Sequence, residues 1–207
     1  MQQLCKVLDG KSILITGGTG SFGRAFTRAI LAHGNPKKVI VFSRDEQKHH
    51  AMQTEFGDPR IRYFVGDVRD GNRMNLALRG VDMVVHAAGM KHVHVCEYNP
   101  LEAINTNITG TVNVIQAALD QGVEKVVGVS TDKAVAPVNL YGASKLCLEK
   151  LLVAANSYSG DRSTSSMAPF MSIQKRVMRS SVMVSLPCWR CRKNSGITLP
   201  ALPITLP

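Results

Sequence analysis

The sequence predicts an α/β fold in which helices cover both faces of a doubly wound parallel sheet. Three observations predict it: short apolar runs recur along the first 130 residues, amphipathic segments separate these runs, and a glycine-rich turn follows the first run. Continuous apolar strands are typical of a parallel sheet that is buried on both faces, and the helices between them act as right-handed crossovers. We therefore expect one sheet built from repeated strand–helix units.

Five strands and three of the intervening helices follow from the pattern of apolar residues. The predicted strands are residues 12–16, 39–42, 61–65, 81–88 and 123–129. The predicted helices are residues 22–32, 45–56 and 102–119.

The composition of the 207 residues, 44% apolar and 19% charged, is that of a globular protein. The sequence has no apolar run long enough to span a membrane and no signal-peptide segment at its start, so we expect a soluble, cytoplasmic protein. Five scattered cysteines predict no disulfide framework and fit a reducing compartment.

The net charge of +10 is concentrated in the last part of the chain, because residues 163–207 contain six basic residues and no acidic one. Residues 1–162 contain 19 basic and 15 acidic residues, a net charge of +4. This modest excess suits an anionic small molecule and gives no indication of nucleic acid binding.

The strand–helix alternation ends near residue 162, which divides the chain into two parts. Residues 1–162 form the predicted domain, whereas residues 163–207 are rich in serine and proline and show no strand–helix pattern. We interpret residues 163–207 as a basic tail that is translated from a shifted reading frame. A genuine flexible tail is the alternative. On this interpretation the sheet is incomplete on its C-terminal side, and its last strand has an exposed, unpaired edge.

A glycine motif, G-x-x-G-x-x-G, lies between the first strand and the first helix. It consists of Gly17, Gly20 and Gly23, with Thr19, Ser21 and Phe22 between them. Glycines at a strand–helix turn let backbone amides and the helix N-terminus approach a pyrophosphate. In this position the motif predicts dinucleotide binding.

The end of the second strand predicts which nicotinamide cofactor binds. Ser43, Arg44 and Lys48 offer a hydroxyl, a guanidinium and an ammonium group for a 2′-phosphate, which favours NADP over NAD. Asp45 is the residue that argues for NAD, unless it caps the following helix. Asp67, with Val68 behind it, follows the third strand where an adenine edge would lie, although Asp67 could also be a simple helix-start residue.

Candidate acid and base groups follow the fifth strand. Tyr141 and Lys145 have the i, i+4 spacing that places two side chains on one helix face. A tyrosine has a pKa of about 10, so a nearby ammonium group is needed to make it a base at neutral pH. The strand end supplies Thr131, Asp132 and Lys133. Together with Tyr141, Asp132 and Lys133 make more acid and base groups than a simple alcohol oxidation needs. As an isolated pair, Asp132 and Lys133 would be only a surface ion pair.

Residues 10–162 resemble the extended short-chain dehydrogenase/reductases, a Rossmann-fold family, and among them most closely the inverting UDP-N-acetylglucosamine 4,6-dehydratases. The resemblance is carried by TGGTGSFGRAF, VFSRDEQK, FVGDVRD, HAAGMKHV, EYNPLEAINTN and STDKAVAPVNLYGASK. It implies a lyase of polysaccharide biosynthesis that acts on UDP-N-acetylglucosamine, holds NADP and forms a homo-oligomer. It also implies that Ala87 and Lys91 contact the cofactor, although His94 stands where the family would have proline.

The resemblance further implies a role for each candidate residue. Tyr141 with Lys145 would deprotonate the sugar 4-hydroxyl while hydride passes to NADP, and Thr131 would bind the reacting hydroxyl. Lys133 would remove the C5 proton and Asp132 would protonate the leaving 6-hydroxyl. Hydride would return to C6, with inversion at C5.

Two other functions stay open at this point. A UDP-hexose 4-epimerase would share the cofactor loop but needs no acid–base pair like Asp132 and Lys133. A non-catalytic NADP-binding fragment would follow if residues 163–207 replace the family's sugar-binding region. No metal site is expected: His92 and His94 lack a third ligand, and Cys188 and Cys191 lack a second cysteine pair.

Overall fold

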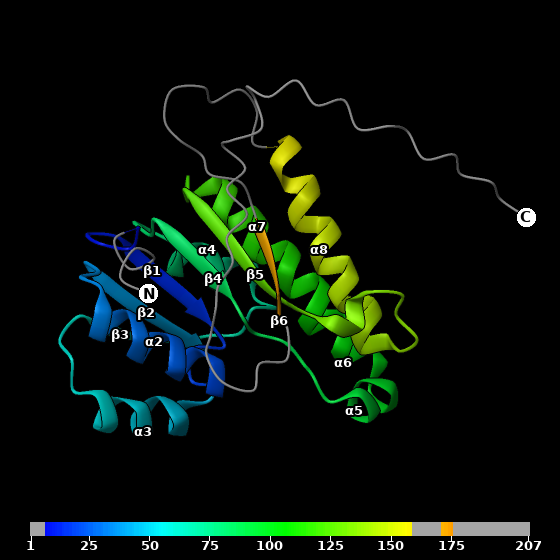
Figure 1. Ribbon diagram of the computed structural model, residues 1–207, viewed down its shortest axis with the longest axis horizontal. Helices are drawn as coiled ribbons and strands as arrows, with labels where there is room; N and C mark the ends of the chain where they lie inside the picture. The colour runs from blue at the N-terminus through cyan, green and yellow to red at the C-terminus, as the bar shows by residue number, and fades with distance from the viewer. Residues whose placement is uncertain (1–6, 159–170, 176–207) are drawn as a thin grey trace, which may run out of the picture. The chain divides into compact units, whose positions relative to one another are not determined.

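The computed structural model describes residues 7–158 and 171–175 (Figure 1). A six-stranded sheet with the order β3-β2-β1-β4-β5-β6 forms its centre, and every neighbouring pair of strands is parallel. The strands are β1 (Ser12–Thr16), β2 (Lys38–Ser43), β3 (Ile61–Val65), β4 (Met83–His86), β5 (Lys125–Thr131) and β6 (Met171–Lys175). The doubly wound α/β fold is therefore confirmed, with its switch point between β1 and β4.

The helices alternate with the strands. They are α2 (Ser21–His33), α3 (Glu46–Phe56), α4 (Gly71–Ala77), α5 (Val93–Tyr98), α6 (Pro100–Ile104), the π-helical turn η1 (Asn105–Thr109), α7 (Gly110–Asp120), the 3₁₀ turn η2 (Asp132–Ala134) and α8 (Leu140–Tyr158). None of these helices is sufficiently long and apolar to cross a membrane.

Apolar side chains form a core on each face of the sheet, in three clusters in all, which explains why the strands read as continuous apolar runs. Leu14 of β1 packs into the core that includes Val114 of α7 and Leu148 of α8. Its neighbours Ile13 and Ile15 belong to the other core, with residues of α2. Because successive strand residues point to opposite faces, both sets must be apolar.

Strands β4 and β5 differ from the predicted ranges for a local reason. β4 begins at Met83 rather than at residue 81, because the Val81 amide donates to the Leu78 carbonyl in a turn. β5 begins at Lys125, since the Val123 amide is used by the end of α7, and it continues to Thr131 because its last residues pair with β6.

The strand β6 corrects the expectation that no strand follows residue 162. It pairs with residues 127–131 of β5, so the outer edge of β5 is not left unpaired there. The sequence Met-Ser-Ile-Gln-Lys alternates apolar and polar residues, and a search for continuous apolar runs does not detect it. The rest of the predicted tail, with Cys188 and Cys191, lies outside the described residues.

The predicted helix over residues 102–119 is present as α6, η1 and α7, with the π-helical turn in its middle. Such turns contain one residue more than an α-helical turn and occur frequently at functional sites. Here the turn contains Asn107, whose side chain is fully buried.

A buried chain of hydrogen bonds joins β1, β4 and this long helix through His86. The Thr16 hydroxyl accepts from two backbone amides just after β4 (both 3.1 Å), so its proton is donated to His86 Nδ1 (2.8 Å). His86 Nε2 then donates to Thr111 Oγ1 (3.1 Å), whose hydroxyl donates to the Asn107 carbonyl (2.6 Å). Each group has one consistent role only if His86 is neutral, with its proton on Nε2.

Acidification is expected to lower the free energy of unfolding through His86. Burial, with the charge of Lys145 as a smaller cause, lowers the pKa of His86 from 6.5 to about 3. Between these values the unfolded chain binds a proton that the folded chain does not, so stability falls as the pH decreases, by up to about 1.4 kcal/mol per pH unit. Urea unfolding at a series of pH values measures this slope. His86→Gln should remove the part of the pH dependence that comes from His86. His50→Gln, at an exposed position of α3, should leave the pH dependence unchanged. An unchanged slope in His86→Gln would contradict the neutral imidazole.

Gly23→Ala is expected to destabilise the fold by about 1–3 kcal/mol, the usual cost of inserting a group into a packed interior. A Cβ at this position would overlap the carbonyl oxygen of Gly18. Gly71→Ala is the matched control, because its Cβ would meet Asn113 Oδ1 at 3.4 Å, an ordinary contact. Thermal unfolding of the two variants tests the difference, and equal losses would argue against the close approach at Gly23.

Candidate functional site

The candidate site lies where the carboxyl ends of the strands meet, around the switch point between β1 and β4. The first part of it is the glycine loop after β1. Gly17 has a φ of +65°, and a Cβ there would lie 2.9 Å from the Ala88 amide nitrogen in the loop after β4. A Cβ at Gly18 would lie 2.9 Å from the Ile15 carbonyl oxygen, so this glycine, which lies outside the G-x-x-G-x-x-G spacing, has as little room for a side chain as Gly17.

The N-terminus of α2 has a capping and charge pattern that suits an anion. Gly20 is its N-cap residue, no side chain caps the helix, and its first turn contains no acidic residue. Ser21 and Phe22 begin the helix, so their backbone lies at the positive end of the helix dipole. These features fit a pyrophosphate group, as the glycine motif predicts.

The end of β2 is joined to the glycine loop by a hydrogen bond from the Thr19 hydroxyl to the Ser43 hydroxyl oxygen (2.8 Å). Asp45 caps α3, since its carboxylate accepts from the Lys48 amide (3.0 Å), and it also pairs with Lys48 Nζ (2.8 Å). These contacts with Lys48 lower the pKa of Asp45. The cap interpretation of Asp45 is therefore confirmed, and Lys48, a predicted phosphate ligand, has this acid as its counter-ion.

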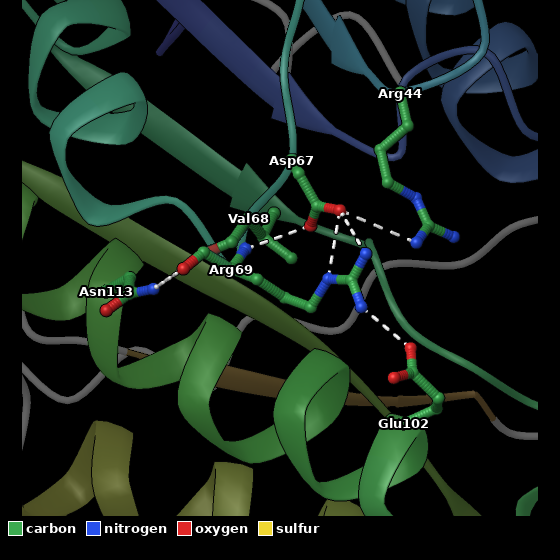
Figure 2. A network of polar contacts seen from close by, with 6 residues as sticks. All are labelled: Arg44, Asp67, Val68, Arg69, Glu102 and Asn113. Carbon is green, nitrogen blue, oxygen red and sulfur yellow. Dashed lines mark hydrogen bonds and ion pairs between the residues drawn. The ribbon is translucent and has the colours of Figure 1, made fainter. Parts of the chain in front are cut away.

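The end of β3 contributes Asp67, which faces two guanidinium groups (Figure 2). Arg69 donates two hydrogen bonds to it, and Arg44 lies 3.5 Å away. Burial alone would raise the pKa of Asp67, but these hydrogen bonds and charges outweigh burial and lower it. Val68, the next residue, is buried against Gly110 at the start of α7.

The loop after β4 is held by Asn107 of the π-helical turn. Asn107 Oδ1 accepts from the Met90 amide (2.7 Å), and its Nδ2 donates to the Met90 carbonyl (3.0 Å) and to Ser144 Oγ of α8 (2.9 Å). Ala87 lies half-buried in this loop, and Lys91 is exposed just after it. Asn107 thus joins the loop that carries these two predicted cofactor contacts to the helix that carries Tyr141.

The ends of β5 and α8 bring the predicted acid–base residues together. Thr131 is buried and donates to Asp132 Oδ1 (2.9 Å), and Lys133 Nζ lies 3.7 Å from the same oxygen. A Cβ on Gly142 would overlap the Lys133 carbonyl oxygen, so the residue after Tyr141 packs directly on this turn.

Lys145, one turn after Tyr141, is 5% exposed and donates from Nζ to the Val129 carbonyl of β5 (3.1 Å). A Cβ on Gly89 would lie 3.3 Å from this nitrogen, so the loop after β4 also approaches it closely. The ammonium group is thus located between the end of β5 and that loop, in the interior of the site, whereas Asp132 and Lys133 are at its exposed rim.

The charge state of Asp132 differs from the one that a general acid needs. The hydrogen bond from Thr131, followed by the charge of Lys133, lowers the pKa of Asp132, so this carboxyl group is ionised at neutral pH.

The loop that follows contains Ala136 with a φ of +47°, a left-handed conformation that is unfavourable by about 1–2 kcal/mol for a residue with a Cβ. Such strain is typical of functional sites.

Sequence reasoning missed Asn107, His86 and Arg69. For Asn107 a signal was present, because polar residues interrupt the apolar face in the middle of a long predicted helix. For His86 the partners Thr16 and Thr111 are distant in sequence, whereas Arg69 binds Asp67 only two residues away and Glu102 at a distance. As for metals, the described part of the chain contains no group of three His, Cys, Asp or Glu residues that could hold an ion.

Comparisons with known proteins show which sequences and structures this chain is similar to. UDP-N-acetylglucosamine 4,6-dehydratase (inverting) of Campylobacter jejuni subsp. jejuni serotype O:23/36 (strain 81-176) is 54% identical over 158 residues, which are 76% of this chain and 47% of the relative. UDP-glucose 4-epimerase of Rickettsia bellii (strain RML369-C) is 48% identical over 147 residues, which are 70% of this chain and 43% of the relative.

The crystal structure of DesIV, a dTDP-glucose 4,6-dehydratase from Streptomyces venezuelae with NAD and TYD bound, has a similar fold, with a TM-score of 0.66 and 31% sequence identity. The match covers 72% of this chain and 52% of the DesIV chain. The chain spans about half the length of the curated relatives it matches. A family model described as polysaccharide biosynthesis protein matches residues 13–194, which is most of the sequence. The chain therefore belongs to the polysaccharide biosynthesis protein family.

Proposed function

We propose that this chain carries the cofactor-binding and acid–base half of a UDP-N-acetylglucosamine 4,6-dehydratase that inverts C5. One observation carries the proposal: the turn with Thr131, Asp132 and Lys133 packs against the first turn of α8, which contains Tyr141 and is followed one turn later by Lys145. The Campylobacter jejuni relative, which has the same name as the proposed activity, supports it.

The proposed cofactor is NADP, which would accept a hydride from the sugar and return it within one turnover. The loop from Gly17 to Gly23 and the N-terminus of α2, which no side chain caps, would hold the pyrophosphate. The remaining contacts would be Ser43, Arg44 and Lys48 for the 2′-phosphate, Asp67 and Val68 for adenine, and Ala87, Lys91, Tyr141 and Lys145 toward the nicotinamide end. Because Arg44 and Lys48 each have an acidic partner here, a 2′-phosphate would have to compete with Asp67 and Asp45.

Tyr141 is the proposed base for the sugar 4-hydroxyl, and Lys145 supports it. The Lys145 ammonium is buried and donates a hydrogen bond to the Val129 carbonyl, so its position is fixed and its charge is shielded from solvent. In this proposal the Lys145 ammonium stabilises the negative charge that develops on the Tyr141 oxygen. Thr131, at the end of β5, would bind the same sugar hydroxyl.

The pair of Asp132 and Lys133 can supply both proton transfers of the elimination. Without ligand the two form an ion pair, 3.7 Å apart. Binding of a sugar over the pair would remove water, and desolvation favours the neutral pair, in which one proton has moved from lysine to aspartic acid. Neutral Lys133 then takes the C5 proton and Asp132 protonates the departing 6-hydroxyl, which restores the ion pair and releases water.

Incubation of the protein with NADP and UDP-N-acetylglucosamine in D₂O tests the proposed reaction. We expect a sugar nucleotide that has lost one water and carries deuterium at C5, detected by mass spectrometry and NMR. An isomer formed without loss of water would instead favour a 4-epimerase, the second candidate, which the Rickettsia bellii relative supports. Cofactor binding without turnover would identify a non-catalytic fragment, a result that the half-length match to the relatives would explain.

Tyr141→Phe and Lys133→Met are expected to lower the rate of dehydration by about 10²–10⁴-fold, the usual contribution of a general base. Lys133→Met should not change the affinity for NADP by more than about twofold, because Lys133 is not among the proposed cofactor contacts. Lys150→Met is the matched control, since Lys150 is an exposed lysine of the same helix as Tyr141 and should leave the rate unchanged. Full activity of Lys133→Met would remove this residue from the mechanism.

A further inference from the structure

Two arginines share one carboxylate oxygen at the ends of β2 and β3. Asp67 Oδ2 accepts from Nε and Nη2 of Arg69, at 2.9 and 2.8 Å, and Arg44 Nη1 lies 3.5 Å from the same atom (Figure 2). Arg69 is therefore joined to Asp67 by two hydrogen bonds, whereas Arg44 makes a longer ion pair.

Arg69 is fixed from several sides. Its Nη1 donates to Glu102 Oε2 of α6 (2.7 Å), and its backbone amide donates to Asp67 Oδ1 (3.0 Å). Its carbonyl accepts from Asn113 Nδ2 of α7 (2.9 Å). Arg44, in contrast, is 57% exposed at the end of β2. The carboxylate thus has a permanent partner in Arg69 and an exchangeable one in Arg44.

We propose that Arg69 is a positioning residue for cofactor selectivity: by holding the Asp67 carboxylate, it leaves Arg44 available to the 2′-phosphate of NADP. The inference rests on the proposed binding of a nicotinamide dinucleotide at this site. The chemistry is a competition between two anions for one guanidinium. The Oδ2 atom of Asp67, which already accepts two hydrogen bonds from Arg69, attracts Arg44 weakly, and the phosphate dianion then prevails.

Loss of Arg69 would reverse this competition. Asp67 is part-buried, and its lowered pKa keeps it charged at neutral pH, so it requires a cationic partner. Without Arg69, Arg44 is the cation that remains beside it and would form the stronger, two-bonded pair. Arg44 would then be less available to a 2′-phosphate, while NAD, which has a free 2′-hydroxyl, would be affected much less.

The experiment measures the dissociation constants of NADP and NAD for the full chain by isothermal titration calorimetry. In Arg69→Gln the preference for NADP over NAD is expected to fall about tenfold, the size of one charge-assisted hydrogen bond. Arg69→Lys keeps the charge but cannot make both bonds to Oδ2, and the preference should fall about threefold. Arg79→Gln and Arg79→Lys, at an exposed arginine after α4, are the matched controls and should leave the preference unchanged.

Repeating the Arg69 substitution in the Arg44→Gln variant separates the proposed competition from a general structural effect. In Arg44→Gln, replacing Arg69 should no longer change the ratio of the two dissociation constants. Equal losses of NADP and NAD affinity in Arg69→Gln, or a loss of preference that persists without Arg44, would overturn the inference. If the unsubstituted protein bound neither dinucleotide, the proposed cofactor site itself would fail, which is a different result.

Discussion

The side-chain amide of Asn107 is the contact on which the site geometry depends. It binds the Met90 backbone through both its oxygen and its nitrogen and reaches Ser144 of α8, so it joins β4, the π-helical turn and the helix of Tyr141. The carbonyl of the same residue ends the hydrogen-bond chain through His86. A fully buried amide that satisfies several partners fixes one arrangement of these elements, because any displacement would leave buried polar groups unpaired.

Three exposed basic side chains around the site each have an acidic partner. Arg44 faces Asp67, Lys48 faces Asp45 and Lys133 faces Asp132, and in each pair the basic residue is about half exposed or more. Exposed ion pairs contribute little to stability, so each can be opened at small cost when an anionic ligand arrives. The ammonium of Lys145 is different, since it is buried and bound to a backbone carbonyl, so breaking its contact would be more costly.

Much of the fold, and part of the site, could be predicted from the sequence because the relevant signals are local. Residues 12–16 and 61–65 were predicted as strands with their observed bounds, and Asp45 could be recognised as a possible cap from its position alone. β6 was missed because its pairing with β5, rather than its own composition, makes it a strand. His86 was missed for the same reason, because only the folded chain brings it near Thr16 and Thr111. For Arg69 the bond to Asp67 is local, but the approach of Arg44 to the same carboxylate depends on the fold.

The π-helical turn at Asn105–Thr109 has a consequence for how this family can vary in length. Such a turn is an α-helix with one residue inserted, and each residue advances a helix by about 100°. Deletion of a single residue there would restore a regular helix but rotate Pro100–Ile104 relative to Gly110–Asp120. The Asn107 amide would then point away from Met90. A gap within this short segment in a related sequence is thus a sign that the loop after β4 is held by other means.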